Sequence, residues 1–168
     1  MEFELKTLSP EAVARAIAKA ERYRLLNEPA EAESICLDAL AIEPDNHDAL
    51  LNLLLALTEQ FEEEVPSAVT EAFKVIERLN DPYERAYYSG IVWERRAKAQ
   101  LHRGGLGLGA QVYASMREAM IWYERAETLR PAGNDDALLR WNTCARVIMR
   151  DHRLAPASEE RGEPLFLE

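Results

Sequence analysis

Histidine and cysteine are the residue types of this chain that could bind a metal ion or act as nucleophile and base. His47, His102 and His152 have no cysteine, aspartate or histidine at a spacing that would complete a metal site locally. Cys144 lies in the last expected helix and His152 just after its end, and eight residues at helical spacing separate them by about 12 Å, too far for a nucleophile and its base. We therefore expect no metal ion, no cofactor and no catalytic cysteine.

The glycine-rich segment 104–109 could cradle a phosphate group if its surroundings were suitable. Phosphate-binding loops follow a strand, lead into a helix and carry a fixed pattern such as G-x-G-x-x-G or G-x4-G-K-S/T. Here the segment joins two expected helices, and neither pattern is present. We interpret it as a flexible connector, with a flap that closes over a bound peptide as the alternative. Neighbouring carboxylates such as Asp135 and Asp136 are expected to be solvated helix caps, so the chain is expected not to be an enzyme.

The composition favours helices. Among 168 residues, Ala, Leu and Glu account for 70, whereas Val, Ile and Thr account for 19. The formal net charge is −10, and non-specific binding of nucleic acid needs surplus Lys and Arg, so no nucleic-acid partner is expected. The most apolar stretch, residues 49–57, is less than half of the roughly 20 residues needed to span a membrane. With two cysteines far apart in sequence and no signal-peptide pattern, we expect a cytoplasmic protein that does not interact with membranes.

Proline, asparagine and glycine divide the chain into seven expected helices. Their approximate ranges are 10–26, 30–42, 47–61, a fourth that follows Pro66 and ends at 79, 82–102, 110–129 and 135–150. No segment alternates with a period of two residues over a length that would indicate a strand. We expect one domain, residues 1–152, followed by an acidic tail, residues 153–168.

One pattern of small residues occurs twice. Its two copies are Ala32-x3-Cys36-x2-Ala39-x4-Pro44 and Ala119-x3-Tyr123-x2-Ala126-x4-Pro131. Small residues seven positions apart lie on one face of a helix and let a partner helix approach closely. Each copy is followed by a similar helix start, which indicates stacked helical hairpins.

In these features the chain resembles the tetratricopeptide repeat family. Residues 13–46 form a unit of 34 residues, the repeat length of that family, with Ala20 and Tyr23 at the positions of its usual small and aromatic residues. The unit 82–131 is longer and contains the glycine segment, and Gly90 matches the small residue of its first helix. The resemblance implies an all-α, right-handed solenoid of about three antiparallel hairpins plus a terminal helix.

The family resemblance also implies a binding groove. In such solenoids the first helices of successive hairpins line a concave surface that binds a peptide or protein segment. The alignment assigns the following residues to that surface: Asn52, Leu55, Tyr87, Tyr88, Ile91, Arg95, Arg140, Thr143 and Arg146. Tyr and Arg dominate the energetics of many interfaces. The alternative for Tyr87 or Tyr88 is a core position between hairpins, since adjacent residues cannot both point fully inward.

Charge is distributed unevenly along the chain. Residues 1–80 hold 7 basic and 17 acidic side chains, whereas residues 85–153 hold 12 basic and 7 acidic ones. A solvated surface without function would account for this distribution, but a groove with a positive end would favour a partner with acidic residues.

Some family members clasp a partner's C-terminal carboxylates with Lys, Asn and Arg spread across three hairpins, with a Lys and an Asn in the first unit. This chain keeps Asn52 in the middle unit and Arg140 later. It has Ile17 and Glu21 in the first unit, so we do not expect that role.

The last expected helix has apolar residues around more of its circumference than one packing face needs. Beyond residue 154 the one apolar cluster is Leu165, Phe166 and Leu167, preceded by Pro164. We expect this cluster to dock on the helix face that contains Trp141 or Ile148, in the same chain or in a second copy as a homodimer. A free tail is the alternative.

Together these observations predict a non-catalytic module for protein–protein interaction, a scaffold whose partner is an unidentified protein or peptide. Two other classes of function remain open. The first is a small-ligand-binding or enzymatic helical protein that uses a pocket near the glycine segment. The second is a self-assembly unit.

Overall fold

The computed structural model describes residues 3–63, 67–105 and 107–157 and divides into two compact units, Met1–Arg85 and Ala86–Glu168. All regular secondary structure in those described ranges is helical, with no strand, as the composition predicts. The division falls inside helix α5, after its first turn. The two units are described separately below.

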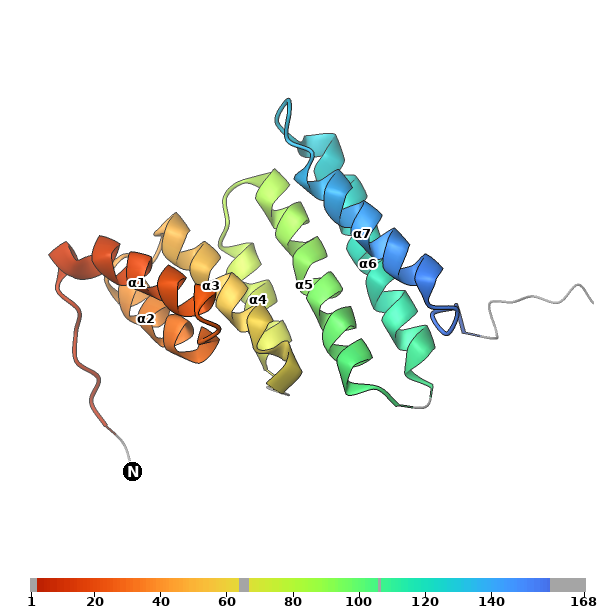
Figure 1. Cartoon of the computed structure of the whole chain (residues 1–168). Helices are drawn as coiled ribbons and strands as arrows, with labels where there is room; N and C mark the ends of the chain where they lie inside the picture. Colours follow the sequence, from red (N-terminus) through yellow and green to blue (C-terminus); the bar gives the residue numbers. More distant parts are fainter. Residues whose placement is uncertain (1–2, 64–66, 106, 158–168) are drawn as a thin grey trace, which may run out of the picture. The chain divides into compact units, whose positions relative to one another are not determined.

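Unit 1 begins with a 3-10 turn, η1 (Pro10–Ala12), that leads into α1 (Val13–Leu25) and α2 (Pro29–Ile42). It continues with α3 (His47–Glu59), the 3-10 turn η2 (Phe61–Glu63) and α4 (Ala68–Glu77) (Figure 1). Asn27, in the left-handed conformation with φ 62°, directly follows the C-cap residue of α1, and Pro29 opens α2. The Oδ1 atom of Asn46 accepts a hydrogen bond of 3.0 Å from the amide of Ala49 and so caps α3.

Small side chains bring the helices of unit 1 close together. Each of α1, α2 and α3 packs against the helix that follows it in the chain, and α1 also contacts α3. Ala32, Cys36 and Ala39 of the first repeated pattern are all 0% exposed, which confirms that the pattern marks a packing face.

Unit 2 contains most of α5 (Pro82–Arg103) together with α6 (Leu108–Leu129) and α7 (Asp136–Arg150). In Figure 1 α5 and α6 run in opposite directions, and α7 lies beside α6, with which it makes extensive contacts. Ala119, Tyr123 and Ala126 of the second repeated pattern are 0% exposed. The two copies of the pattern therefore play the same packing role, one in each unit.

The seven helices lie where the sequence predicts them, with small differences at their ends. The third helix ends at Glu59, and η2 covers the next residues instead of a continuous α-helix. The sixth helix begins at Leu108, inside the glycine segment, two residues before the expected start. None of the helices in the described parts of the chain is long and apolar enough to cross a membrane.

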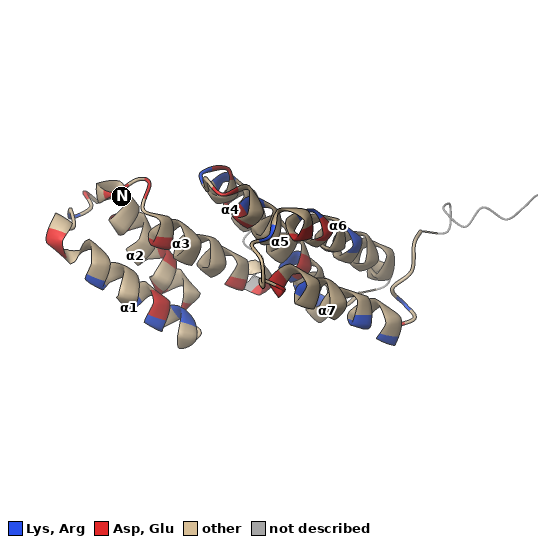
Figure 2. Cartoon of the chain, turned by 90° about the horizontal axis from the view of Figure 1, so that it is seen from above, with Lys and Arg blue, Asp and Glu red and all other residues tan. Residues whose placement is uncertain are grey.

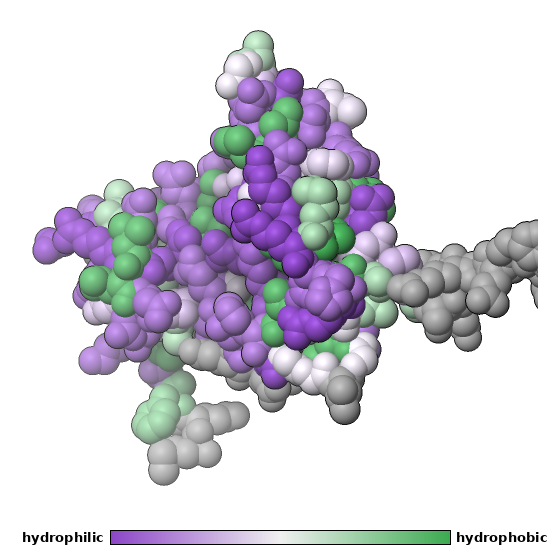
Figure 3. All heavy atoms as spheres, turned by 45° about the vertical axis from the view of Figure 1, so that its right-hand side comes forward, coloured by the Kyte–Doolittle hydropathy of each residue, from purple (hydrophilic) through white to green (hydrophobic). Residues whose placement is uncertain are grey.

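Hydrophilic residues predominate on the face of the molecule shown in Figure 3, and hydrophobic residues form small separate patches there. Large hydrophobic side chains that remain more than half exposed include Leu25, Leu26, Leu37, Leu139 and Met149. Leu139 and Met149 belong to α7, so part of the apolar surplus of that helix faces solvent.

His47, at the start of α3, contacts the first turn of α5 within unit 1. Its Nε2 atom lies 2.8 Å from Oε2 and 3.0 Å from Oε1 of Glu84. The hydrogen bond with Glu84 raises the pKa of His47 above its ordinary value, although partial burial opposes the shift and Asp48 adds to it.

The His47 contact predicts a pH dependence. The raised pKa means that the folded state binds a proton more tightly than the unfolded state does. The resulting stabilisation is complete below about pH 6.5 and is lost as the pH rises through the folded-state pKa of His47. We expect Glu84→Gln to return that pKa toward about 6.5 and to flatten the pH dependence of unfolding near neutrality. NMR titration of the imidazole would test this, with Asp48→Asn as the control that has a smaller effect. A pKa that is unchanged in Glu84→Gln would contradict the prediction.

Candidate functional site

A buried carboxylate lies at the centre of unit 2. Glu94, in the middle of α5, is 0% exposed. Tyr123 of α6 donates a hydrogen bond from its hydroxyl to Oε2 of Glu94 over 2.6 Å. On the other carboxylate oxygen, Oε1, Lys98 Nζ lies at 2.5 Å and Arg140 NH1 of α7 at 3.3 Å. The cluster therefore joins all three helices of the unit.

These donors explain how a charged group remains buried. Removing a carboxylate from water costs several kcal/mol unless hydrogen bonds and opposite charges compensate for it. Both oxygens of Glu94 accept hydrogen bonds, and two cations are adjacent. Burial, followed by the charge of Glu94, raises the pKa of Tyr123 well above its ordinary value, so the phenol stays protonated and remains a donor.

Gly90 makes room for the tyrosine that binds Glu94. A Cβ atom at residue 90 would lie 2.6 Å from Cδ1 of Tyr123 and would overlap Cε1 of the same ring. Because Gly90 stands one turn before Glu94 on α5, the missing side chain lets the Tyr123 ring cross α5 and reach the carboxylate.

Arg140 connects the buried carboxylate to one of the predicted groove residues. Burial lowers the pKa of Arg140, but the charge of Glu94 and a hydrogen bond with Tyr87 outweigh burial and raise it overall, so Arg140 stays charged. The Tyr87 ring lies 5.2 Å from the ring of Tyr88 and 6.0 Å from that of Tyr123, measured between centroids. Tyr87 and Tyr88 are both half-buried, intermediate between the groove and core positions considered for them.

The predicted groove residues of unit 2 differ widely in exposure. Ile91 is 2% exposed and belongs to the core, so it offers no surface to a partner. Arg95 is half-buried, and Arg146 is exposed. Thr143 is half-buried and donates a hydrogen bond of 3.0 Å to the carbonyl of Leu139. The structure thus brings Tyr87 and Arg140 into contact, whereas Arg146 lies about 9 Å further along α7 and about 120° around it.

The two predicted groove residues of unit 1 are half-buried on α3. Asn52 accepts a hydrogen bond of 3.0 Å from Arg24 NH1 and donates one of 3.0 Å to the carbonyl of Asp48. Arg24 also forms two hydrogen bonds with the carboxylate of Glu59, at 2.8 and 3.2 Å. The amide of Asn52 is therefore engaged within unit 1, and Leu55 lies one turn further along the same helix.

Sequence reasoning missed Glu94 and Lys98, although a signal was present. Glu94 and Lys98 have the i, i+4 spacing that is typical of an exposed ion pair on a helix surface. The repeat pattern singled out Gly90 and Tyr123. Because Glu94 lies one turn after Gly90 on α5, a contact between Gly90 and Tyr123 places Glu94 on the buried face of that helix. The missing information was which residues of α5 face α6.

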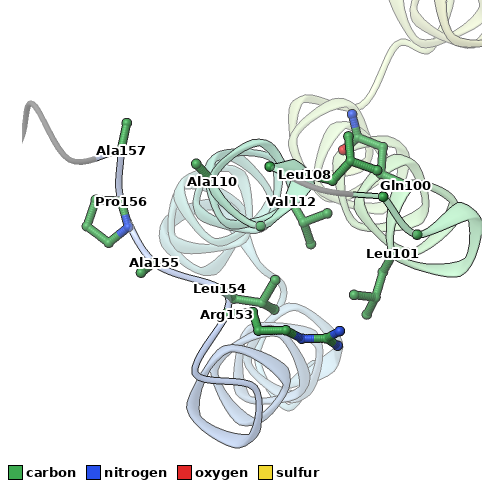
Figure 4. A pocket seen from close by; sticks show the side chains of 14 residues that line it. Gln100, Leu101, Leu108, Ala110, Val112, Arg153, Leu154, Ala155, Pro156 and Ala157 are labelled. Atoms are coloured by element: carbon green, nitrogen blue, oxygen red, sulfur yellow. The ribbon is translucent and has the colours of Figure 1, made fainter.

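A pocket of about 550 Å³ lies at one end of unit 2, beside the glycine segment (Figure 4). Its walls come from the end of α5, the start of α6 and residues 153–157. Figure 4 shows Leu101, Val112 and Leu154 directed toward one another across it. Among the described residues that line the pocket, Arg153 is the one with an ionisable side chain. The lining therefore offers a binding surface without a general acid and base pair.

Arg153 is fixed at the rim of the pocket by Asp151. Its Nε and NH2 atoms donate to the two carboxylate oxygens over 2.9 and 2.6 Å. Hydrogen bonds from the side chain and the backbone amide of Arg153 lower the pKa of Asp151 to about 2, so both groups are ionised at neutral pH.

The two cysteines are buried thiols in different units. Burial raises the pKa of Cys36 to about 11 and that of Cys144 to about 12. Both therefore carry almost no thiolate at neutral pH, and a thiol in that state is a poor nucleophile. Within the described residues, no group of three or more His, Cys, Asp or Glu side chains is arranged to hold a metal ion.

Comparisons with protein-family models, with curated proteins and with solved structures find no match for this chain. Its function is therefore inferred from the sites described above.

Proposed function

We propose that this chain is a non-catalytic protein-interaction module that binds an acidic segment of a partner protein on the face of unit 2 formed by α5 and α7. We further propose that its hairpins stack as a right-handed solenoid of the tetratricopeptide type and that it works as a scaffold in the cytoplasm. The solenoid rests on the repeated patterns, whose small residues are buried at the same relative positions in both units.

The observation that carries the binding proposal is the charge imbalance around Glu94. Two cations, Lys98 and Arg140, share one carboxylate, yet their side chains keep 40% and 36% of their surface exposed. One carboxylate neutralises one of the two positive charges, so the surface above it remains positive. The described part of unit 2 also holds 11 basic and 7 acidic side chains, many of them along α5, α6 and α7 (Figure 2). This surplus favours an acidic ligand.

The cluster is also held in place before a ligand arrives. Arg140 is fixed by Glu94 and by Tyr87, so binding a carboxylate would cost little side-chain entropy. A neighbouring half-buried tyrosine, Tyr88, supplies apolar surface of the type found in interface hot spots. An enzymatic function is less well supported, because neither site combines an accessible nucleophile with a base.

The proposal predicts a specific loss of binding. The probe is a fluorescein-labelled peptide of about 12 residues that combines glutamate with leucine and tyrosine, and binding is followed by fluorescence anisotropy. We expect Arg140→Gln to bind about tenfold more weakly, since one charge contact of about 1.5 kcal/mol is removed. Glutamine at residue 140 avoids placing a second carboxylate beside Glu94.

The matched control is Arg117→Gln, which removes the same charge at an exposed position of α6. We expect this control to change the affinity less than twofold and both variants to keep the wild-type circular dichroism spectrum. An equal loss in the control would show that overall charge, and not the α5–α7 face, attracts the peptide. A basic peptide that binds as tightly as the acidic one would also contradict the proposal.

A further inference from the structure

The pocket beside the glycine segment is built by the chain that leaves α7. After Asp151 the backbone turns, with the amide of Leu154 donating a hydrogen bond of 2.9 Å to the carbonyl of Asp151. Leu154 is then 5% exposed, and residues 155–157 continue along the pocket wall (Figure 4). The described chain thus reaches residue 157 while still lining the pocket.

Because Gly109 has no side chain, residues 153–157 can approach the start of α6 closely. A Cβ atom at residue 109 would overlap the carbonyl oxygen of Arg153, so a larger residue at this position would push the segment away. The close approach of backbone to backbone fixes one wall of the pocket and therefore its shape. The opposite wall includes Gln100 and two apolar residues, Leu101 and Val112, which are directed into the space.

The sequence that follows residue 157 contains apolar side chains that could fill this pocket. Seven residues separate Ala157 from Leu165, and at about 3.3 Å per residue the chain can extend some 25 Å, enough to turn back into the pocket. The apolar side chains beyond that point are Leu165, Phe166 and Leu167. Residues 158–168 contain four Glu and one Arg, whereas the described part of unit 2 has 11 basic and 7 acidic side chains. The tail and the unit are therefore complementary in charge as well as in apolar character.

We propose that Leu165, Phe166 and Leu167 of the same chain occupy the pocket formed by the end of α5, the start of α6 and residues 153–157. A volume of about 550 Å³ is within the range of pockets that bury compact apolar ligands. The sequence-based expectation placed this cluster on the α7 face that contains Trp141 or Ile148, and the cluster itself lies outside the described residues. Trp141 is already half-buried and donates its indole N–H to Glu124 over 2.8 Å, so that face offers less free apolar surface.

NMR relaxation of the full chain tests whether the cluster is held. In the wild type we expect backbone order parameters of residues 165–167 close to 0.85, the value of an ordered backbone. Leu101→Trp fills the pocket with a larger side chain and is expected to lower them below about 0.6. Leu129→Trp is the matched control, because Leu129 is 44% exposed at the end of α6 and does not line the pocket. Order parameters below about 0.6 in the wild type would overturn the proposal.

A second variant probes the pocket from the side of the tail. Phe166→Glu is expected to shift the amide resonances of residues 107–110 and 153–157, whereas Phe3→Glu, at a residue that is 81% exposed, should leave them unchanged. Phe166→Glu changes none of the described residues, so it remains informative if Leu101→Trp fails to fold. Amide resonances of residues 107–110 and 153–157 that do not shift in Phe166→Glu would overturn the proposal. Sedimentation shows whether an ordered tail coincides with dimer formation, and a tail ordered only in the dimer would also overturn docking within one chain.

Discussion

Glu94→Ala is expected to lower the free energy of unfolding by about 3–5 kcal/mol, the range measured when one partner of a buried ion pair is removed. The substitution takes away the acceptor of the Tyr123 hydroxyl and leaves a cavity where three helices meet. It also leaves the positive charges of Lys98 and Arg140 close together without the negative charge that offsets their mutual repulsion. For a domain whose total stability is about 5–15 kcal/mol, a loss of this size would leave a substantial unfolded fraction.

Urea unfolding followed by circular dichroism measures this loss, with Glu94→Gln as the matched variant. The amide keeps the size of the side chain and one acceptor oxygen, so we expect a smaller loss of about 1–3 kcal/mol. The same substitution at an exposed carboxylate of α6, Glu118→Gln, should change stability by less than about 0.5 kcal/mol. Equal stability of Glu94→Ala and wild type would show that the cluster does not hold the three helices together.

Gly90→Ala is expected to destabilise unit 2, although alanine is the better helix former. The added methyl group would overlap the Tyr123 ring, which is 0% exposed and is held by its hydrogen bond to Glu94. Overpacking of this kind costs about 1–3 kcal/mol, and the gain in helix propensity offsets about 1 kcal/mol of it. We expect a net loss of up to about 2 kcal/mol in urea unfolding.

A double-mutant cycle identifies the cause of that loss. In a Tyr123→Leu background the ring is absent, so Gly90→Ala should become neutral or stabilising there. The coupling energy between the two positions should then be at least about 1 kcal/mol, as for residues in direct contact. A Gly90→Ala effect that is the same in both backgrounds would place its origin elsewhere.

Local signals in the sequence were sufficient to predict the helices. Pro29, Pro44 and Pro82 and the residues next to them restrict the backbone in ways that act over a few residues, and the helix boundaries follow them. The buried alanines were also predictable, since small residues seven positions apart identify a close helix contact whichever helix is the partner.

The candidate site depended on information that the sequence does not carry locally. The spacing of Glu94 and Lys98 is the same for a solvated pair and for a buried one, and only contact with α6 and α7 distinguishes them. Ile91 was assigned to the groove from its position in an aligned repeat, but a rotation of α5 by a fraction of a turn decides whether such a residue faces a partner or the core. The pocket near the glycine segment depends on residues 153–157, which lie far from α5 in sequence.

The two buried cysteines provide one built-in reporter for each unit. Cys36 lies in unit 1 and Cys144 in unit 2, and both are 0% exposed. A thiol reagent can reach either sulfur only when its own helices separate, so the rate of labelling at each cysteine measures the free energy of opening of that unit. Comparing the two rates in one sample, under conditions where both units stay folded on average, would show whether the units open together or independently, without any change to the sequence.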